Sequence, residues 1–219
     1  MIELPILDSS GKKVDTLKID EGLLGGEVRH ALLKQAYVIT HGNQRQGSAR
    51  TKSRGSVAGS TRKLYKQKGT GNARVGASRV PHRKGGGVAF SKTRTREDFR
   101  TQMTRKMRQL ANRNALLAKL VDSEVKCMKE LSFKNPKTQD FAAMLKACGV
   151  DRTCLVAVHG DNQNTIISAR NIEGVSVVRI EQLTAFDLLN HRFLVVDKAS
   201  LQSFIDGTAF TANDSKEAA

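Results

Sequence analysis

One continuous stretch of the chain, residues 43–96, contains 15 lysine or arginine residues and no aspartate or glutamate. Up to residue 87 its larger apolar side chains, set among nine glycines and a few alanines, are little more than Val57, Leu64, Tyr65, Val75 and Val80. Such a composition cannot bury enough apolar surface to offset the entropy lost on ordering. We therefore expect an extended segment without a core of its own, which we call the basic loop.

The basic loop holds almost all of the excess charge of the protein. The chain has 219 residues, with 37 basic and 21 acidic side chains and a formal net charge of +16. Outside the loop, 22 basic residues face 21 acidic ones, a net of +1. Cations gathered in this way indicate a polyanionic partner, with nucleic acid first and an acidic membrane surface second. The plain alternative is a solvated charge run, but the glycines, threonines and tyrosine between the cations favour close contact.

Several other classes of protein find little support in the sequence. No apolar run approaches the roughly 18 residues of a membrane span. The first residues carry Glu3 and no basic region, so we expect neither a signal nor a transit peptide. Cys127, Cys148 and Cys154 form no Cys-x-x-Cys pair and are interpreted as structural thiols in a reducing cytosol. The five histidines show no ligand spacing, and we expect no metal or other cofactor.

The rest of the chain predicts an α/β fold. Strands are predicted at residues 2–7, 13–19, 125–131, 153–160, 174–180 and 192–197. Helices are predicted at residues 27–41, 96–121, 137–149, 162–172, 184–190 and 198–207. Continuous Val, Ile and Leu runs that alternate with helices indicate a mostly parallel sheet with helices on both faces, in a single three-layer domain. That globular domain would comprise residues 1–42 and 97–210, with the basic loop at 43–96 and a disordered tail at 211–219.

The longest predicted helix, residues 96–121, has an apolar stripe at helical spacing. The stripe is broken only by Asn114 and consists of Phe99, Met103, Met107, Leu110, Leu117 and Val121. Its simplest interpretation is packing against the domain core.

The segment "KQKGTGNARVG", residues 66–76, resembles a nucleotide-binding loop only in its glycines. A phosphate-binding loop needs a lysine directly after its second glycine, between a strand and a helix. Here Gly76 is followed by Ala77 and Ser78, and no apolar strand precedes the segment. The dinucleotide fingerprint fails as well, because Arg74 stands where its third glycine is required. A nucleotide site is therefore not favoured.

The same glycines and cations suit a polymer of phosphates. Glycine lets the backbone approach a sugar-phosphate chain, and arginine can clamp phosphates or stack on exposed bases. An irregular basic segment fits folded RNA better than a regular DNA groove. The candidate RNA-binding residues are Arg45, Arg50, Lys52, Arg54, Arg62, Lys63, Tyr65, Lys66, Gln67, Lys68, Gly69, Gly71, Arg74, Arg79, His82, Arg83, Lys84, Lys92, Arg94, Arg96, Arg105 and Lys106.

An enzymatic function is the weaker alternative. His159 and Asp161 follow one predicted strand and Asp197 ends another, where α/β enzymes place ligands. No nucleophile elbow or paired-carboxylate motif accompanies them. We interpret all three as strand-end turn residues and expect no catalytic site.

Specific motifs resemble those of a known family. They are "RQGSARTKSRG" (45–55), "QKGTG-x-AR-x-G" (67–76), "GGGVAF" (85–90), "RKMRQLANRNAL" (105–116), "ARNIEGVSVV" (169–178) and "TAFDLLNHRFLVV" (184–196). Together they resemble ribosomal protein four of the large subunit in its bacterial form, over about residues 1–207. The resemblance implies a structural, non-enzymatic constituent of the large ribosomal subunit in the cytoplasm, which binds rRNA and supports assembly beside other large-subunit proteins.

The resemblance also implies a role for the end of the basic loop. In this family a globular α/β domain lies on the solvent side while the loop threads into the rRNA, and its tip helps to line the nascent-peptide exit tunnel. Carried over by position, the tip residues are Gln67, Lys68, Gly69, Thr70 and Asn72. Some members also repress their own operon by binding its messenger RNA, which leaves a regulatory RNA-binding role open as an alternative.

The chain departs from the family pattern at a few loop positions. Asn72 stands where an arginine is usual, and Leu64 and Tyr65 replace a Pro-Trp pair. His82 stands near a position that usually holds tryptophan. With one cation fewer at the tip, Lys68 would carry more of the charge there, and Tyr65 keeps a flat face for stacking.

Overall fold

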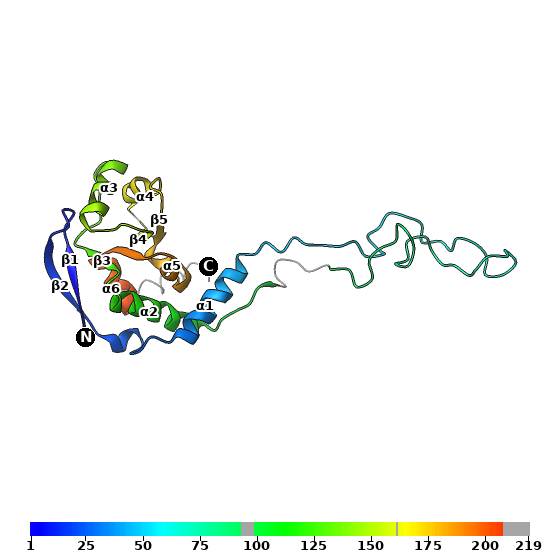
Figure 1. The fold of residues 1–219 in the computed structure, drawn as a ribbon, viewed down its shortest axis with the longest axis horizontal. Helices are drawn as coiled ribbons and strands as arrows, with labels where there is room; N and C mark the ends of the chain where they lie inside the picture. The colour runs from blue at the N-terminus through cyan, green and yellow to red at the C-terminus, as the bar shows by residue number, and fades with distance from the viewer. Residues whose placement is uncertain (93–98, 161, 208–219) are drawn as a thin grey trace, which may run out of the picture. The chain divides into compact units, whose positions relative to one another are not determined.

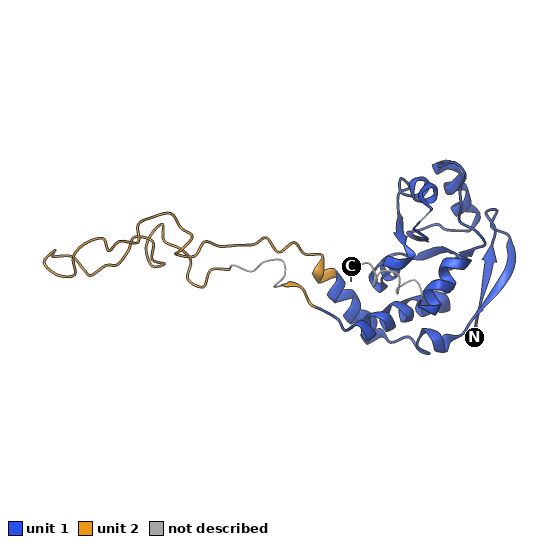
Figure 2. Cartoon of the chain, turned by 180° about the vertical axis from the view of Figure 1, so that it is seen from behind, with its two compact units in different colours: residues 1–40, 102–219 blue, residues 41–101 orange. Residues whose placement is uncertain are grey.

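The structure, a computed structural model, describes residues 1–92, 99–160 and 162–207. It separates into two compact units (Figure 2). The first unit is formed by residues 1–40 and 102–219, and the second by residues 41–101. The predicted disordered tail, residues 211–219, lies outside the described residues.

The first unit is built on a six-stranded sheet (Figure 1). The strands are β1 (Ile2–Leu7), β2 (Lys13–Ile19), β3 (Val125–Met128), β4 (Cys154–Val158), β5 (Val175–Arg179) and β6 (Phe193–Asp197). Their order across the sheet is β2-β1-β3-β6-β4-β5. The hairpin of β1 and β2 is antiparallel, and the four other neighbouring pairs of described strands are parallel. The predicted mostly parallel α/β sheet is therefore confirmed.

Helices cover both faces of the sheet. They are α1 (His30–Asn43), α2 (Arg105–Val121), α3 (Thr138–Ala147), α4 (Gln163–Ala169), α5 (Ala185–Asn190) and α6 (Lys198–Asp206), with short 3-10 turns η1 (Glu21–Leu24) and η3 (Ile180–Gln182). Buried residues of α2, α5 and α6 share one apolar cluster with β1, and those of α3 and α4 share a second cluster. The sheet is thus the middle of three layers (Figure 1).

Strand β4 shows how the two clusters are separated. All five of its residues are buried. Leu155 and Ala157 belong to the cluster of α2, α5 and α6, whereas Cys154, Val156 and Val158 belong to the cluster of α3 and α4. Successive side chains of a strand point to opposite faces, so a continuous apolar run is what a strand covered on both sides requires.

The longest helix begins later than its sequence pattern predicts. A helix was expected from residue 96, but α2 begins at Arg105, and residues 100–104 have no regular structure. Thr104 takes the N-cap position with an extended ψ of 147°. Upstream, Thr101 exchanges two hydrogen bonds with Asn43, and these hold its backbone out of a helix. The prediction for residues 100–104 was therefore wrong, and residues 96–98 lie outside the described residues.

The predicted stripe on this helix is also displaced. Leu117 is buried, but Val121 at the C-terminal end is 60% exposed. Asn114, the expected break in the stripe, is completely buried. Its Oδ1 accepts a hydrogen bond from the backbone N–H of Arg29 at 2.7 Å, and its Nδ2 donates to the backbone carbonyl of Glu27. A buried amide with both ends paired can take a core position at little cost.

A second asparagine on α2 fixes the start of another helix. Asn112, only 7% exposed, accepts a hydrogen bond from the backbone N–H of Ala185 at 2.9 Å and donates to the carbonyl of Leu183. Thr184 and Asp187 complete a capping box at the same helix start. The two amides of α2 therefore position the loop before α1 and the start of α5. None of the described helices is long and apolar enough to span a membrane.

Candidate nucleic-acid interface

The basic loop forms most of the second unit, and its described residues beyond α1, 44–92, have no regular secondary structure. No helix or strand occurs between residues 44 and 92. The chain runs out along one limb, residues 44–66, and returns along a second, residues 72–92 (Figure 1). Hydrogen bonds that join the limbs include Thr51 N to Lys92 O (3.0 Å), Val88 N to Lys52 O (2.9 Å), Ser78 Oγ to Ser60 O (3.3 Å) and Leu64 N to Gly76 O (3.2 Å). Isolated bonds of this kind align the limbs without forming a β ladder.

The two limbs meet in an open turn. The bond between the limbs nearest to it is donated by the Tyr65 hydroxyl to the carbonyl of Ala73, at 2.5 Å. Within the turn, Gly69 and Gly71 both adopt positive φ, at +80° and +69°, a conformation that glycine adopts without strain. The structure brings all five predicted tip residues to this turn and leaves each of them exposed: Gln67, Lys68, Gly69, Thr70 and Asn72. The Gln67 side chain also accepts a hydrogen bond from Lys63 Nζ.

The cations of the loop face solvent. Of the 15 in the sequence, 13 fall in described positions; of these, Arg79 and Arg83 are partly buried and 11 are exposed. The exposed ones are Arg45, Arg50, Lys52, Arg54, Arg62, Lys63, Lys66, Lys68, Arg74, Lys84 and Lys92. Because residues 43–96 contain no carboxylate side chain, none within the loop neutralises them. Positive charge is therefore presented along both limbs and at the turn.

Two of three consecutive glycines lie against backbone, Gly87 where the two limbs meet and Gly86 within the returning limb. At Gly87, an added Cβ would lie 2.3 Å from the backbone nitrogen of Arg54 and 2.4 Å from the carbonyl carbon of Ser53. At Gly86 it would lie 1.9 Å from the carbonyl oxygen of Val80. All three distances are shorter than a carbon can approach such atoms. The glycine run in "GGGVAF" therefore serves contact between protein backbones in this structure.

The base of the loop contains two contacts that sequence reasoning missed. Asn43 Nδ2 donates to the carbonyl of Thr101, and Thr101 N donates to Asn43 Oδ1, each at 2.9 Å. The Arg45 guanidinium lies 4.5 Å from the ring centroid of Phe99, a cation–π arrangement. Phe99 had been assigned to the stripe of a helix, and only the tertiary pairing of residues about 55 positions apart reveals its role.

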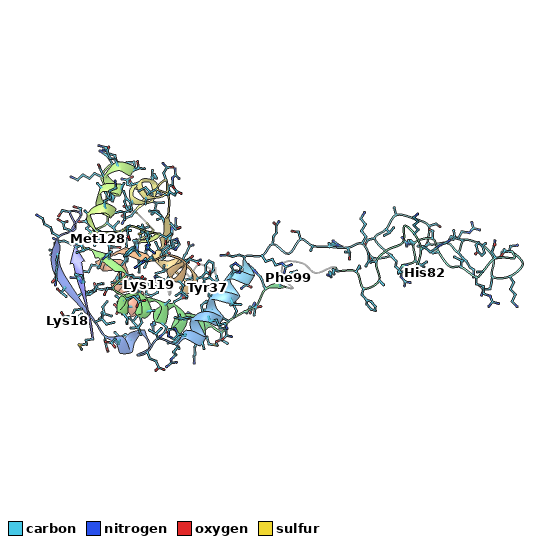
Figure 3. All side chains as sticks on the ribbon, viewed as in Figure 1. Lys18, Tyr37, His82, Phe99, Lys119 and Met128 are labelled. Atoms are coloured by element: carbon cyan, nitrogen blue, oxygen red, sulfur yellow. The ribbon has the colours of Figure 1, made fainter. Side chains whose placement is uncertain are left out.

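The remaining predicted RNA-binding residues differ in exposure and in the unit to which they belong. His82 is exposed on the returning limb (Figure 3), whereas Tyr65 is half-buried and its hydroxyl closes the turn. Arg105 and Lys106 are exposed in the first turn of α2 and belong to the first unit. The last two candidates, Arg94 and Arg96, lie outside the described residues. RNA binding by all of these side chains stays a prediction.

Other chemistries find no assembled site in the described part of the chain. Residues 66–76 contain neither the strand nor the helix that a phosphate-binding loop requires. No group of three or more potential metal ligands occurs among the described residues. Asp197 accepts a hydrogen bond from the backbone N–H of Ser200 and caps α6, and Asp161 lies outside the described residues.

The three cysteines are buried in the first unit, without disulfides. Burial raises the pKa of the Cys127 thiol to about 11, with the Asp197 carboxylate contributing in the same direction. Burial likewise raises the pKa of Cys154 to about 12. Thiols with raised pKa values are poor nucleophiles, as expected of structural cysteines.

The model of the ribosomal protein L4/L1 family matches residues 17–206 of this chain. The chain belongs to the ribosomal protein L4/L1 family. The earlier resemblance is thereby confirmed. A protein named large ribosomal subunit protein uL4 from Dehalococcoides mccartyi is 42% identical over 201 residues, which cover 92% of this chain and 95% of the relative. A uL4 protein from Rhodopirellula baltica is 40% identical over 209 residues, covering 95% and 93% of the two chains. As a member of the L4/L1 family, the chain is a structural ribosomal protein and not an enzyme.

Proposed function

We propose that this chain is a structural constituent of the large ribosomal subunit, in the cytoplasm, and that its basic loop binds the rRNA of that subunit. The observation that carries the proposal is a segment with 15 cations and no acidic residue, whose described part, residues 44–92, is laid out as two irregular limbs without a core. Such a segment buries little surface within the protein itself. Insertion among the phosphates of folded RNA would bury its backbone and neutralise its charge together.

The first unit has a different part in this function. Its charge is nearly balanced, and it has a well-packed core on both faces of the sheet. It would anchor the loop, contact other proteins of the large subunit and support assembly. The exposed Arg105 and Lys106 at the start of α2 would add a contact to rRNA from this unit.

The turn of the basic loop would line the nascent-peptide exit tunnel. Support comes from the position of Gln67, Lys68 and Thr70 at the exposed end of two aligned limbs, and from the family to which the chain belongs. Nascent polypeptide would then pass the lysine and amide side chains of the turn. Replacing Lys68 with glutamate should change the cross-linking of a stalled nascent chain to this turn without releasing the protein from the subunit.

Salt dependence of RNA binding tests the central proposal. Each phosphate neutralised contributes about 0.7–0.9 to the slope of log affinity against log salt concentration. Replacing Lys66, Lys68 and Arg74 with alanine should lower that slope by up to about 2–3 for a large-subunit rRNA fragment. Lys18→Ala serves as the control, because Lys18 lies in the first unit and pairs with Glu3 at 3.6 Å. An unchanged slope and affinity after replacement of residues 45–99 by a short glycine-serine linker would refute the proposal.

The same binding assay addresses the regulatory alternative. The leader transcript of the chain's own operon can be compared with an unrelated hairpin at equal salt. Equal affinities are expected if the cations recognise phosphates alone, since phosphate contacts carry no sequence information. A preference for the leader would add messenger RNA to the partners.

A further inference from the structure

Phe90 on the returning limb is exposed in a way that its own unit does not explain. Its side chain is 104% exposed relative to the reference state. Its backbone φ is +50°. Among the described non-glycine residues, a positive φ is found only at Phe90 and Ser123. Bulky L residues rarely adopt this conformation, which is found where the surroundings or a function require it. In the sequence, the motif "GGGVAF" carries this position as an aromatic residue three places after a run of glycines.

Hydrogen bonds on either side of Phe90 place it in a bulge of the returning limb. Thr51 and Lys52 are adjacent on the outgoing limb, but their partners on the returning limb, Lys92 and Val88, are four positions apart. Lys92 N also donates to Thr51 Oγ1 at 2.8 Å, so this pairing is held by two bonds. The three residues between the partners have no counterpart on the opposite limb and form a bulge. Phe90 is the middle residue of that bulge.

The base of the bulge is held in place by backbone contact. Gly87, directly before Val88, packs against Ser53 and Arg54 so closely that an added Cβ would lie 2.3 Å from Arg54 N. Val88 N then bonds to the carbonyl of Lys52 at 2.9 Å. The limbs are therefore joined before and after the bulge, and Phe90 is presented from a fixed frame.

The chemistry around the bulge identifies its partner. Lys52 and Lys92 form the base of the bulge, Arg54 lies beside Gly87, and all three side chains are exposed. An exposed aromatic ring on a bulge whose base carries exposed cations matches an unstacked nucleobase with its flanking phosphates, because every base offers a π face and every phosphate a negative charge. Val88 and Ala89 beside the ring are apolar, but the exposed lysines at the base of the bulge favour a polyanion over an apolar pocket on another protein, because lysine is depleted at protein–protein interfaces.

We propose that Phe90 stacks on an unpaired nucleobase of the RNA, while Lys52 and Lys92 contact the adjacent phosphates. This inference rests on the proposed RNA-binding function and adds a contact to a base, where the cations contact the backbone. The bulge would recognise a site where one base is turned out of its helix, and would thereby help to set the register of the loop on the RNA.

The chain contains no tryptophan, which makes a direct test possible. In the full chain, Phe90→Trp introduces a single tryptophan at the centre of the bulge. Deproteinised large-subunit rRNA should quench its fluorescence, whereas polyphosphate, a polyanion without bases, should not. Val14→Trp is the control, since Val14 is 54% exposed in the first unit and should be unaffected by either polymer. RNA binding detected by anisotropy without quenching at position 90 would overturn the stacking.

Affinity measurements give a second, independent readout. Phe90→Ala should weaken rRNA binding by roughly 5- to 100-fold, the range for removal of a base-stacking aromatic, with the salt slope unchanged. Phe90→Tyr should restore affinity, and Phe90→Gly should remain weak although it relieves the positive φ. Val88→Ala, which truncates a neighbouring side chain that is 52% exposed, should have little effect.

The outcomes separate this inference from the proposed function. If the wild-type chain binds rRNA with a steep salt slope and Phe90→Ala binds equally well, only the stacking is refuted. If the wild-type chain does not bind rRNA, the proposed function fails as well. If the Phe90→Trp emission shifts only when other large-subunit proteins are added, the partner of the ring is a protein, and the inference is wrong.

Discussion

Asn43 and Thr101 exchange two hydrogen bonds, each of 2.9 Å, between the last residue of α1 and the chain that returns from the basic loop. The amide side chain of asparagine is both donor and acceptor, so one residue pairs with both backbone groups of Thr101. This contact closes the loop at its base. It also explains why the helical pattern of residues 100–104 does not produce a helix.

Replacing Asn43 with alanine should open the base of the loop. The two bonds are exposed, so their combined contribution is about 1 kcal/mol, and the amide of Thr101 should exchange its hydrogen roughly five times faster. Amide hydrogen exchange measures this directly. Gln44→Ala is the matched control at the neighbouring exposed position. Equal exchange rates in the two variants would show that the Asn43 contact does not hold the loop.

Replacing Gly87 with alanine should force the limbs apart. The new Cβ would meet the backbone of Ser53 and Arg54, which cannot move aside as a flexible side chain could. Strain of this kind typically costs about 1–3 kcal/mol, and affinity for large-subunit rRNA should fall by about tenfold or more, with the Tm of the first unit unchanged. Gly76→Ala is the control, because no atom lies within 4 Å of its added Cβ. If both variants bind RNA equally, the close approach at Gly87 has no role in binding.

Replacing Asn114 with alanine should destabilise the first unit. The change leaves the N–H of Arg29 and the carbonyl of Glu27 without the partner they have now, and each lost partner costs about 1–3 kcal/mol. We expect a loss of about 2–4 kcal/mol in the free energy of unfolding, measured by urea denaturation. Gln109→Ala on the same helix should change it by less than about 0.5 kcal/mol. Equal losses in both variants would refute this role for Asn114.

The buried thiol of Cys127 should make stability depend on alkaline pH. Its pKa is raised from an ordinary value of 9.0 to about 11, so the folded protein holds the proton more tightly than the unfolded chain does. The resulting stabilisation is complete below pH 9 and is lost as pH rises towards 11, by an amount on the order of 2 kcal/mol. Comparing wild type with Cys127→Ala at pH 8 and pH 10.5 isolates this thiol from other titrating groups. A difference between the two proteins that does not change with pH would contradict the assignment.

The α/β sheet and the basic loop could both be recognised from local sequence. The run Cys154–Val158 is apolar at every position because both faces of its strand are covered, and that requirement is visible without a structure. Likewise, the loop can be recognised in the sequence because residues 43–96 contain 15 cations and no acidic residue. Both signals arise from composition within a few neighbouring residues.

The details of the loop and of α2 depended on residues distant in sequence. In the sequence, Asn114 interrupts an apolar stripe. Its role is clear only from the structure, where its side chain is hydrogen-bonded to the backbone of Glu27 and Arg29. The sequence pattern places Phe99 in the core face of a helix, whereas in the structure its ring contacts the Arg45 guanidinium.

By itself, the amino-acid sequence determined the class of fold, the place of the loop and the sign of its charge, because periodicity and charge are local properties. Only the tertiary structure decided where α2 begins, how the limbs align and that Phe90 points outwards. Those features come from hydrogen bonds and close contacts between distant segments, such as Gly87 against Ser53 and Arg54, whose pairing no local pattern encodes.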